Sequence, residues 1–185
     1  RPFNPGELVI GAHGTFFARS IDAEVNLTTE CMVAASKHDG LSVIEVLVNC
    51  MIFNNGTHKA FAGDKEVRAE HTITLRQGEK MLFGKNMDKG LMLDNMKLKV
   101  VTVGENGVTL DDILVHDAHE KDTMVHVMLA SMKYPDFPVA LGIIRDVAEP
   151  TYEREVARQI AEVQATAKIK NVDDLLNSGE TWEVE

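Results

Sequence analysis

The residue whose chemistry stands out first is Cys50, because it follows directly after a long apolar run. Residues 41–48 are nearly all apolar and rich in β-branched side chains, which predicts a strand buried on both faces in a parallel sheet covered by helices. Asn49 and the turn-forming segment 54–56 end that strand. Ligands of open α/β sheets bind just outside the carboxyl ends of strands, so Cys50 is a candidate sulfur ligand or nucleophile. The alternative is that Cys50 is a small apolar side chain that only fills space there.

Two other chemically capable residues lie within predicted apolar elements. Glu45 is inside the 41–48 run, where a carboxylate must be hydrogen-bonded or protonated, and we expect it to hold neighbouring backbone in place. Cys31 recurs with Leu27, Ala34 and Ala35 at helical spacing, so its thiol is predicted to be part of the core.

His116, Asp117 and His119, with Asp111 and Asp112 nearby, are the residue types that bind metals. No helix or hairpin obviously brings them together, and a zinc site needs a further His, Cys or carboxylate close by. We therefore interpret them as solvated polar residues after a strand, with a zinc-binding domain built on His116 and His119 kept as a rival hypothesis.

Composition and missing motifs exclude several classes of function. The chain has 185 residues, 44% of them hydrophobic, and a net charge of −10, which argues against binding nucleic acid or an anionic membrane. It contains neither a run long enough to span a bilayer nor the glycine-rich or serine motifs of nucleotide-binding proteins and hydrolases. Two cysteines suggest no disulfide framework, so a cytoplasmic location is expected. The chain begins with Arg1 and could be a processed product or a piece of a longer protein.

The elements around Cys50 form a predicted βαβ unit. A strand at residues 15–19, a helix ending near His38 and the strand at 41–48 follow one another, and such a unit has parallel strands. A short helix over residues 5–13 precedes it. A second central strand is predicted at residues 139–144.

The remaining segments are less regular in pattern. Residues 56–95, punctuated by glycines and charges, are predicted to be a long irregular excursion. Residues 97–103 alternate like a half-exposed strand, and Asn106-Gly107 predicts a hairpin with a partner strand inside 108–116. A helix is expected after Asp122, and the tail 151–178 is predicted to be helical.

Three passages, spread along the chain in order, resemble one family. They are NPGELVIGAHGTFFAR near the start, GLSVIEVLVNCMIFNN around Cys50, and FPVALGIIRDVAEPTYE with the closing LLNSGETWEV. They resemble the β subunit of 2-oxoacid:ferredoxin oxidoreductases, most closely the 2-oxoglutarate type. The resemblance implies that residues 1–185 form the C-terminal part of a thiamine-diphosphate-binding α/β domain, with a mostly parallel sheet flanked by helices and an added β-hairpin.

An intact enzyme of this kind decarboxylates a 2-oxoacid, passes electrons through a 4Fe–4S cluster to ferredoxin and releases an acyl-CoA. The resemblance makes Cys50 the last of four cluster ligands. The other three cysteines, and the segment that holds thiamine diphosphate and Mg²⁺, are absent here. No catalytic or cofactor-binding residue is therefore assigned besides the metal ligand Cys50, and the chain alone is expected to be inactive and to bind no cofactor. Asn49 replaces the family's proline, Glu45 replaces its aspartate, and Asn54 is expected to shape the loop.

The implied partners are the α subunit, a second β subunit, ferredoxin, the 2-oxoacid and CoA, and the 56–95 excursion is the expected contact with a neighbouring subunit. Two alternatives stay open. The enzyme could be of the pyruvate type, or the chain could be a non-catalytic α/β interaction module.

Overall fold

The computed structural model describes residues 3–182 and 184. The chain folds as two units, residues 1–149 and residues 150–185. The first unit contains both β-sheets, and the second contains two helices. No helix within the described residues has both the length and the apolar character needed to cross a bilayer.

The predicted βαβ unit is confirmed. Strand β1 (Phe16–Ile21) leads into α2 (Val25–Lys37) and then into β2 (Ser42–Leu47). The two strands are parallel, in a register that runs from Phe16 opposite Ser42 to Ile21 opposite Leu47. Helix α2 buries Leu27 and Cys31, so the prediction that Cys31 is part of the core is also confirmed.

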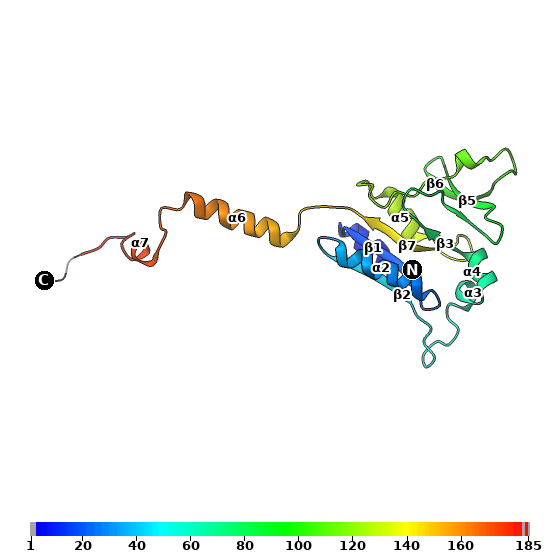
Figure 1. Cartoon of the computed structure of the whole chain (residues 1–185), viewed down its shortest axis with the longest axis horizontal. Helices are drawn as coiled ribbons and strands as arrows, with labels where there is room; N and C mark the ends of the chain where they lie inside the picture. The colour runs from blue at the N-terminus through cyan, green and yellow to red at the C-terminus, as the bar shows by residue number, and fades with distance from the viewer. Residues whose placement is uncertain (1–2, 183, 185) are drawn as a thin grey trace. The chain divides into compact units, whose positions relative to one another are not determined.

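The main sheet has the strand order β2-β1-β7-β3 (Figure 1). Strand β7 (Val139–Asp146) pairs in parallel with β3 (Thr72–Leu75) and antiparallel with β1. Two of the three strand pairings are thus parallel. The predicted class, an α/β fold with a mostly parallel sheet flanked by helices, is confirmed.

The position of β2 corrects one prediction. Its apolar sequence predicts burial on both faces, but β2 lies at the edge of the sheet and every one of its residues is only half-buried. The strand that is buried throughout is β1, and β7 is buried at most of its positions. An apolar run indicates that its side chains favour burial. It does not indicate whether other residues of the same chain bury them.

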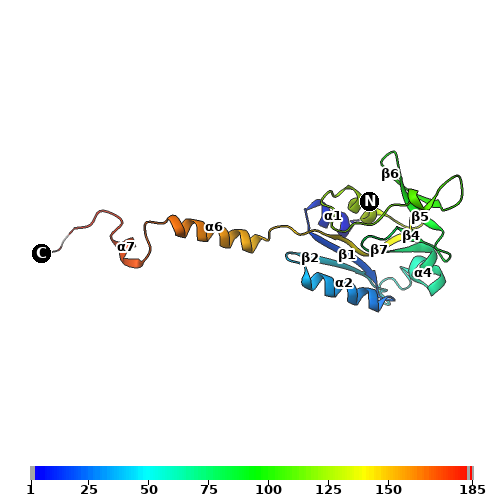
Figure 2. The same ribbon diagram turned by 45° about the horizontal axis from the view of Figure 1, so that its top comes forward.

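Helices cover both faces of the sheet, as Figure 2 shows with α1 on one side and α2 on the other. Under α2 lie Phe16, Ala18 and Leu141. The opposite face packs against α1 (Pro5–Gly11) and α5 (Met124–Ser131). Phe17 of β1 and Leu129 of α5 are among the side chains buried there. Helix α1 starts where expected because Asn4 Oδ1 accepts the N–H groups of Gly6 and Glu7.

Residues 56–95 are not the irregular excursion predicted from their glycines and charges. They form α3 (Lys59–Ala62), α4 (Lys65–His71), β3, β4 (Leu82–Phe83) and β5 (Lys89–Asp94). Strand β3 completes the main sheet, and Met81, Phe83 and Leu91 are buried in its core. The short elements are held by long-range packing, which a local sequence pattern does not report.

The added β-hairpin is present, but it has a different partner and turn from those expected. Strand β6 (Lys97–Thr102) pairs antiparallel with β5, which precedes it, and β4 completes a second sheet in the order β4-β5-β6. Asn95 and Met96 form the turn with φ of 48° and 61°. The segment after Gly107 forms the 3₁₀ turn Leu110–Asp112, where Thr109 and Asp112 make a capping box.

The second unit consists of α6 (Tyr152–Thr166) and α7 (Val172–Leu176), as the tail 151–178 predicts. Thr151 Oγ1 accepts the N–H of Arg154 at the start of α6, and Asn171 accepts that of Asp174 at the start of α7.

The main sheet leaves no room for a side chain at Gly142, and this generates a stability prediction. Gly142 has φ of 97°, and a Cβ there would lie 2.6 Å from the carbonyl oxygen of Leu75. We expect Gly142→Ala to lower the free energy of unfolding by about 1–3 kcal/mol, measured by urea denaturation. Gly104→Ala is the matched control, because Gly104 also has positive φ but open space around its Cβ position. Equal losses in the two variants would show that the approach to Leu75 is unimportant.

Candidate functional site

Cys50 lies in an exposed turn directly after β2. The N–H of Phe53 donates to Cys50 Sγ at 3.4 Å. This donor, followed by the N–H of Ile52, lowers the pKa of the thiol below its usual value. Backbone donors stabilise the thiolate, which is the form that binds metals and attacks electrophiles. The structure therefore places Cys50 where its sulfur is both accessible and easily ionised.

Asn49 closes the loop that presents this thiol. Its backbone N–H donates to Asp22 Oδ2 at 2.9 Å, which a proline could not do. Its side chain accepts the N–H of Gly56 at 2.7 Å and donates to Asn55 Oδ1 at 3.0 Å. The proline that the resemblance implies at this position would lack the backbone donor, and the two side-chain hydrogen bonds depend on the amide of Asn49.

Asn54 shapes the turn from inside. Its N–H donates to the carbonyl of Cys50 at 3.0 Å, and its side chain donates to Thr57 Oγ1 at 2.9 Å. These contacts support the loop-shaping role expected for Asn54.

The large apolar residues on either side of Cys50 in the sequence are exposed to solvent. Met51, Ile52 and Phe53 are 73%, 87% and 91% exposed, and Val48 at the end of β2 is 56% exposed. We call residues 48–53 the Cys50 tip. In Figure 1 the chain leaves β2 at this point as a cyan loop that extends away from the sheet.

Glu45 lies within β2, before the Cys50 tip, and its side chain is on the face of the sheet that packs against α5. Its carboxylate accepts from Arg19 Nε at 2.6 Å, and Arg19 Nη2 donates to the carbonyl of Ala130 at 3.1 Å. Both side chains are largely buried. Glu45 therefore holds backbone indirectly, through an arginine that the sequence analysis did not single out.

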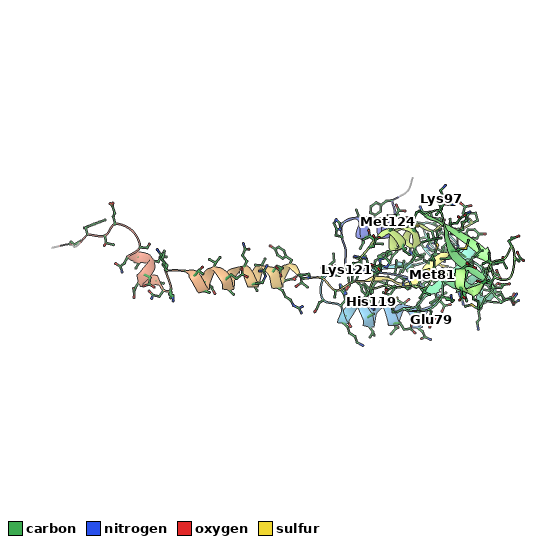
Figure 3. All side chains as sticks on the ribbon, turned by 90° about the horizontal axis from the view of Figure 1, so that it is seen from above. Glu79, Met81, Lys97, His119, Lys121 and Met124 are labelled. Carbon is green, nitrogen blue, oxygen red and sulfur yellow. The ribbon has the colours of Figure 1, made fainter. Side chains whose placement is uncertain are left out.

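Each of the two histidines considered for zinc uses one ring nitrogen in a backbone contact, and the other ring nitrogen of His116, Nδ1, is buried without a hydrogen-bond partner. His116 Nε2 donates to the carbonyl of Ile143 at 2.8 Å, and His119 Nδ1 donates to that of Asp146 at 2.6 Å. Figure 3 shows His119 beside α2, where it lines a cavity with Cys31. In the described part of the chain, no three His, Cys, Asp or Glu side chains converge as a metal site would require. The expectation that these residues are solvated is wrong for His116, of which only 1% is exposed, whereas His119 is exposed. The backbone contact of His116 and its burial indicate a structural role.

His126 and Arg145 form a buried polar hub that sequence reasoning missed. His126 Nε2 donates to the carbonyl of Asp117 at 2.8 Å, which leaves Nδ1 to accept from Arg145 Nη1 at 3.0 Å. Arg145 also donates to the carbonyls of Gly14, Glu120 and Lys121. The imidazole is therefore neutral. Burial first, and then the Arg145 charge, lowers its pKa, although the contact with Asp117 opposes that shift.

A second missed cluster joins Thr15, His38 and Asp146. His38 Nδ1 lies 2.8 Å from Asp146 Oδ1, and its Nε2 lies 2.9 Å from Thr15 Oγ1. The spacing is that of a hydroxyl, imidazole and carboxylate relay, but only 3% of the His38 side chain is exposed and its ring packs on Phe16. We interpret this cluster as structural, because its hydrogen bonds connect the end of α2 to the start of β1 and the end of β7.

Comparisons with known proteins agree with the family resemblance. The chain is 33% identical over its whole length to the 2-oxoglutarate oxidoreductase subunit KorB of Mycobacterium tuberculosis. The resemblance to a 2-oxoglutarate oxidoreductase subunit is confirmed. No family model matches the chain.

A solved structure shares the fold. It is a 2-oxoglutarate:ferredoxin oxidoreductase from Magnetococcus marinus with 2-oxoglutarate, coenzyme A and succinyl-CoA bound, and it matches 98% of this chain with a TM-score of 0.57 and 14% identity. The chain spans only 49% of KorB and 46% of the Magnetococcus chain. About half of a KorB-type subunit therefore lies outside the segment that these 185 residues match.

The buried histidines predict a loss of stability in mild acid. The pKa values of His116 and His126 are below the ordinary 6.5, chiefly because of burial, so the unfolded chain binds these protons more readily. Their contribution is fully present above pH 6.5. Below it, we expect the free energy of unfolding to fall by up to about 1.4 kcal/mol per pH unit for each histidine.

Urea denaturation between pH 5 and pH 8 measures this slope. His126→Gln should flatten the slope and also lower stability, because Arg145 loses an acceptor. The exposed His13, changed to Gln, is the control and should leave the slope intact. A slope that is the same in all three proteins would contradict the assignment of His126 as a neutral, buried group.

The Asn49 contacts predict how the loop controls the thiol. Asn49→Pro removes all three hydrogen bonds, whereas Asn49→Ala keeps the backbone bond to Asp22. We expect the rate of Cys50 alkylation at neutral pH to decrease in the order native, Ala, Pro, since a looser turn presents fewer N–H donors to the sulfur. Iodoacetamide labelling across pH measures the thiol pKa, with buried Cys31 in the same chain as the internal reference. A Pro variant with the native pH profile would show that the turn does not depend on Asn49.

Proposed function

We propose that the chain is the C-terminal part of the β subunit of a 2-oxoacid:ferredoxin oxidoreductase whose 2-oxoacid is 2-oxoglutarate. The support is the 33% identity to KorB along the whole chain, together with the shared fold. The intact enzyme would convert 2-oxoglutarate and CoA to succinyl-CoA and CO₂ and pass the released electrons to ferredoxin. It would work in the cytoplasm, with an α subunit and a second β subunit as partners.

The observation that supports this proposal at individual residues is the exposed Cys50 sulfur with its backbone N–H donor. Iron–sulfur clusters are held by cysteine thiolates, and N–H donors to sulfur tune their potentials. Cys50 has an exposed sulfur, a lowered pKa and the N–H of Phe53 as a donor. These properties fit one ligand of a 4Fe–4S cluster.

One cysteine does not complete such a site. The chain's other thiol, Cys31, is buried in the core, and nowhere in the described residues do three His, Cys, Asp or Glu side chains come together as a metal site would need. The remaining ligands must then come from the rest of the subunit. The 185 residues alone are accordingly proposed to be inactive.

The chemistry is divided between this chain and the groups that the rest of the subunit would hold. Thiamine diphosphate with Mg²⁺ supplies the electron sink for decarboxylation when it is bound. The residues of this chain are proposed to hold the electron-transfer group. The Cys50 turn contributes a thiolate at a defined position, and Asn49 keeps the turn closed.

A cysteine substitution in the complete subunit tests the assignment. We expect Cys50→Ser to abolish or strongly alter the low-temperature EPR signal of the reduced cluster and to lower the iron content after anaerobic purification. Cys31→Ala is the matched control, since that thiol is buried between α2 and the sheet, and its variant should retain the signal. An unchanged signal in Cys50→Ser would remove Cys50 from the ligand set, and the interaction-module alternative would then be preferred.

A further inference from the structure

The loop after β2 contains a chemically labile pair of residues, Asn55-Gly56. The chain has one further Asn-Gly pair, Asn106-Gly107, in the loop after β6. Asparagine is a thermolabile residue, and an Asn-Gly pair is its most reactive context, because glycine has no side chain to obstruct attack of its backbone nitrogen on the asparagine side chain. All four residues are exposed, so water reaches both pairs.

Deamidation at Asn55 needs water and no other reagent. The Gly56 nitrogen loses its proton to water or hydroxide and forms a bond to Cγ of Asn55, while Nδ2 takes up a proton and leaves as ammonia. Water then opens the resulting succinimide ring at either of its two carbonyl carbons. The products are aspartate, or isoaspartate, in which the main chain passes through Cβ and Cγ. The reaction therefore depends on how freely the Gly56 nitrogen and the Asn55 side chain can meet.

Asn49 holds both of these reacting groups. Its Oδ1 accepts the N–H of Gly56 at 2.7 Å, and its Nδ2 donates to Asn55 Oδ1 at 3.0 Å. Before the Gly56 nitrogen can attack, it must give up the proton that Asn49 holds, and the Asn55 side chain must rotate away from Asn49 so that its Cγ approaches that nitrogen. Both movements break a hydrogen bond, so the contacts of Asn49 oppose ring closure.

The pair Asn106-Gly107 is equally exposed but is not held in this way. Gly107 has the same φ as Gly56, 81°, and both glycines have open space at the position of a Cβ. Among the residues that the structure describes, neither the Asn106 side chain nor the Gly107 N–H has a hydrogen-bond partner. The main difference in the surroundings of the two glycine nitrogens is therefore the amide of Asn49.

We propose that Asn55-Gly56 is a latent deamidation site that Asn49 shields, and that Asn106-Gly107 is an open one. The inference does not depend on the proposed function, because it concerns only the chemistry of the loop itself. It gives Asn49 a specific task that the proline implied by the family resemblance could not perform, since proline has no side-chain amide.

Loss of the shield would alter the loop that carries Cys50. Isoaspartate at position 55 lengthens the main chain by a carbon atom just before Gly56, and either product adds a negative charge. The Gly56 N–H would then no longer meet Asn49 Oδ1 in its present geometry. The shield thus preserves the closed form of the loop as the protein ages.

Timed incubation of the complete subunit at mildly alkaline pH tests the shield. Peptide mass spectrometry follows the gain of about one mass unit at each Asn-Gly pair. We expect fast deamidation at Asn106 in every protein, slow deamidation at Asn55 in the native protein, and a several-fold faster reaction at Asn55 in Asn49→Ala. Thr57→Val is the matched control, because it removes the hydrogen bond from Asn54 Nδ2 in the same loop and keeps both contacts of Asn49. Its Asn55 rate should stay near the native one.

Three outcomes would overturn the proposal. They are deamidation of Asn55 in the native protein as fast as that of Asn106, an unchanged or slower rate in Asn49→Ala, and equal acceleration in Thr57→Val. Two measurements need no variant and stand even where Asn49→Ala does not fold. In urea that unfolds the native protein, the rates at Asn55 and Asn106 should converge, and a persistent difference would show that local sequence sets them.

Amide hydrogen exchange is the second of these measurements. In the folded subunit, the Gly56 N–H should exchange several-fold more slowly than that of Gly107, because Asn49 accepts the first and the second has no acceptor among the described residues. Equal exchange of the two amides would contradict the shield directly.

Discussion

The buried contact between Arg19 and Glu45 joins strands β1 and β2 to helices α1 and α5. Arg19 is in the middle of the buried strand β1, and only 5% of it is exposed. It reaches Glu45 of β2 on one side and the carbonyl of Ala130 at the end of α5 on the other. Asn4, which caps α1, donates to that same carbonyl at 3.1 Å. Two helices and two strands are thus connected through one guanidinium and one carbonyl oxygen. Removing either charged group would leave the other buried without an opposite charge, which is strongly destabilising in protein interiors.

This contact also explains how an edge strand can hold the loop that carries Cys50 in place. Strand β2 has a neighbour on one side only, yet Glu45 holds it to β1 and α5 from below while α2 covers its other face. The turn after β2 then has a fixed base. Asn49 and Asp22 complete the support, since the carboxylate of Asp22 accepts the first N–H beyond Val48. The Cys50 sulfur is therefore accessible and also held in position, the combination that a metal ligand requires.

The unpaired edge, the exposed tip and the resemblance to half of a longer subunit are consistent with one another. Exposed aliphatic and aromatic side chains are usual singly, but a contiguous group beside an open strand indicates an interface.

The local elements could be predicted from the sequence because short-range chemistry determines them. The cap at Asn4, the helical spacing around Cys31, the βαβ order and the helical tail are all properties of neighbouring residues. Cys50 was identifiable because a thiol directly follows an apolar strand. Tertiary structure alone decided which strand lies at the edge, that β7 runs antiparallel to β1, and that residues 56–95 complete the sheet. It also decided the partners of Glu45, His38 and His126, because these contacts join residues far apart in the chain, where no local periodicity records them.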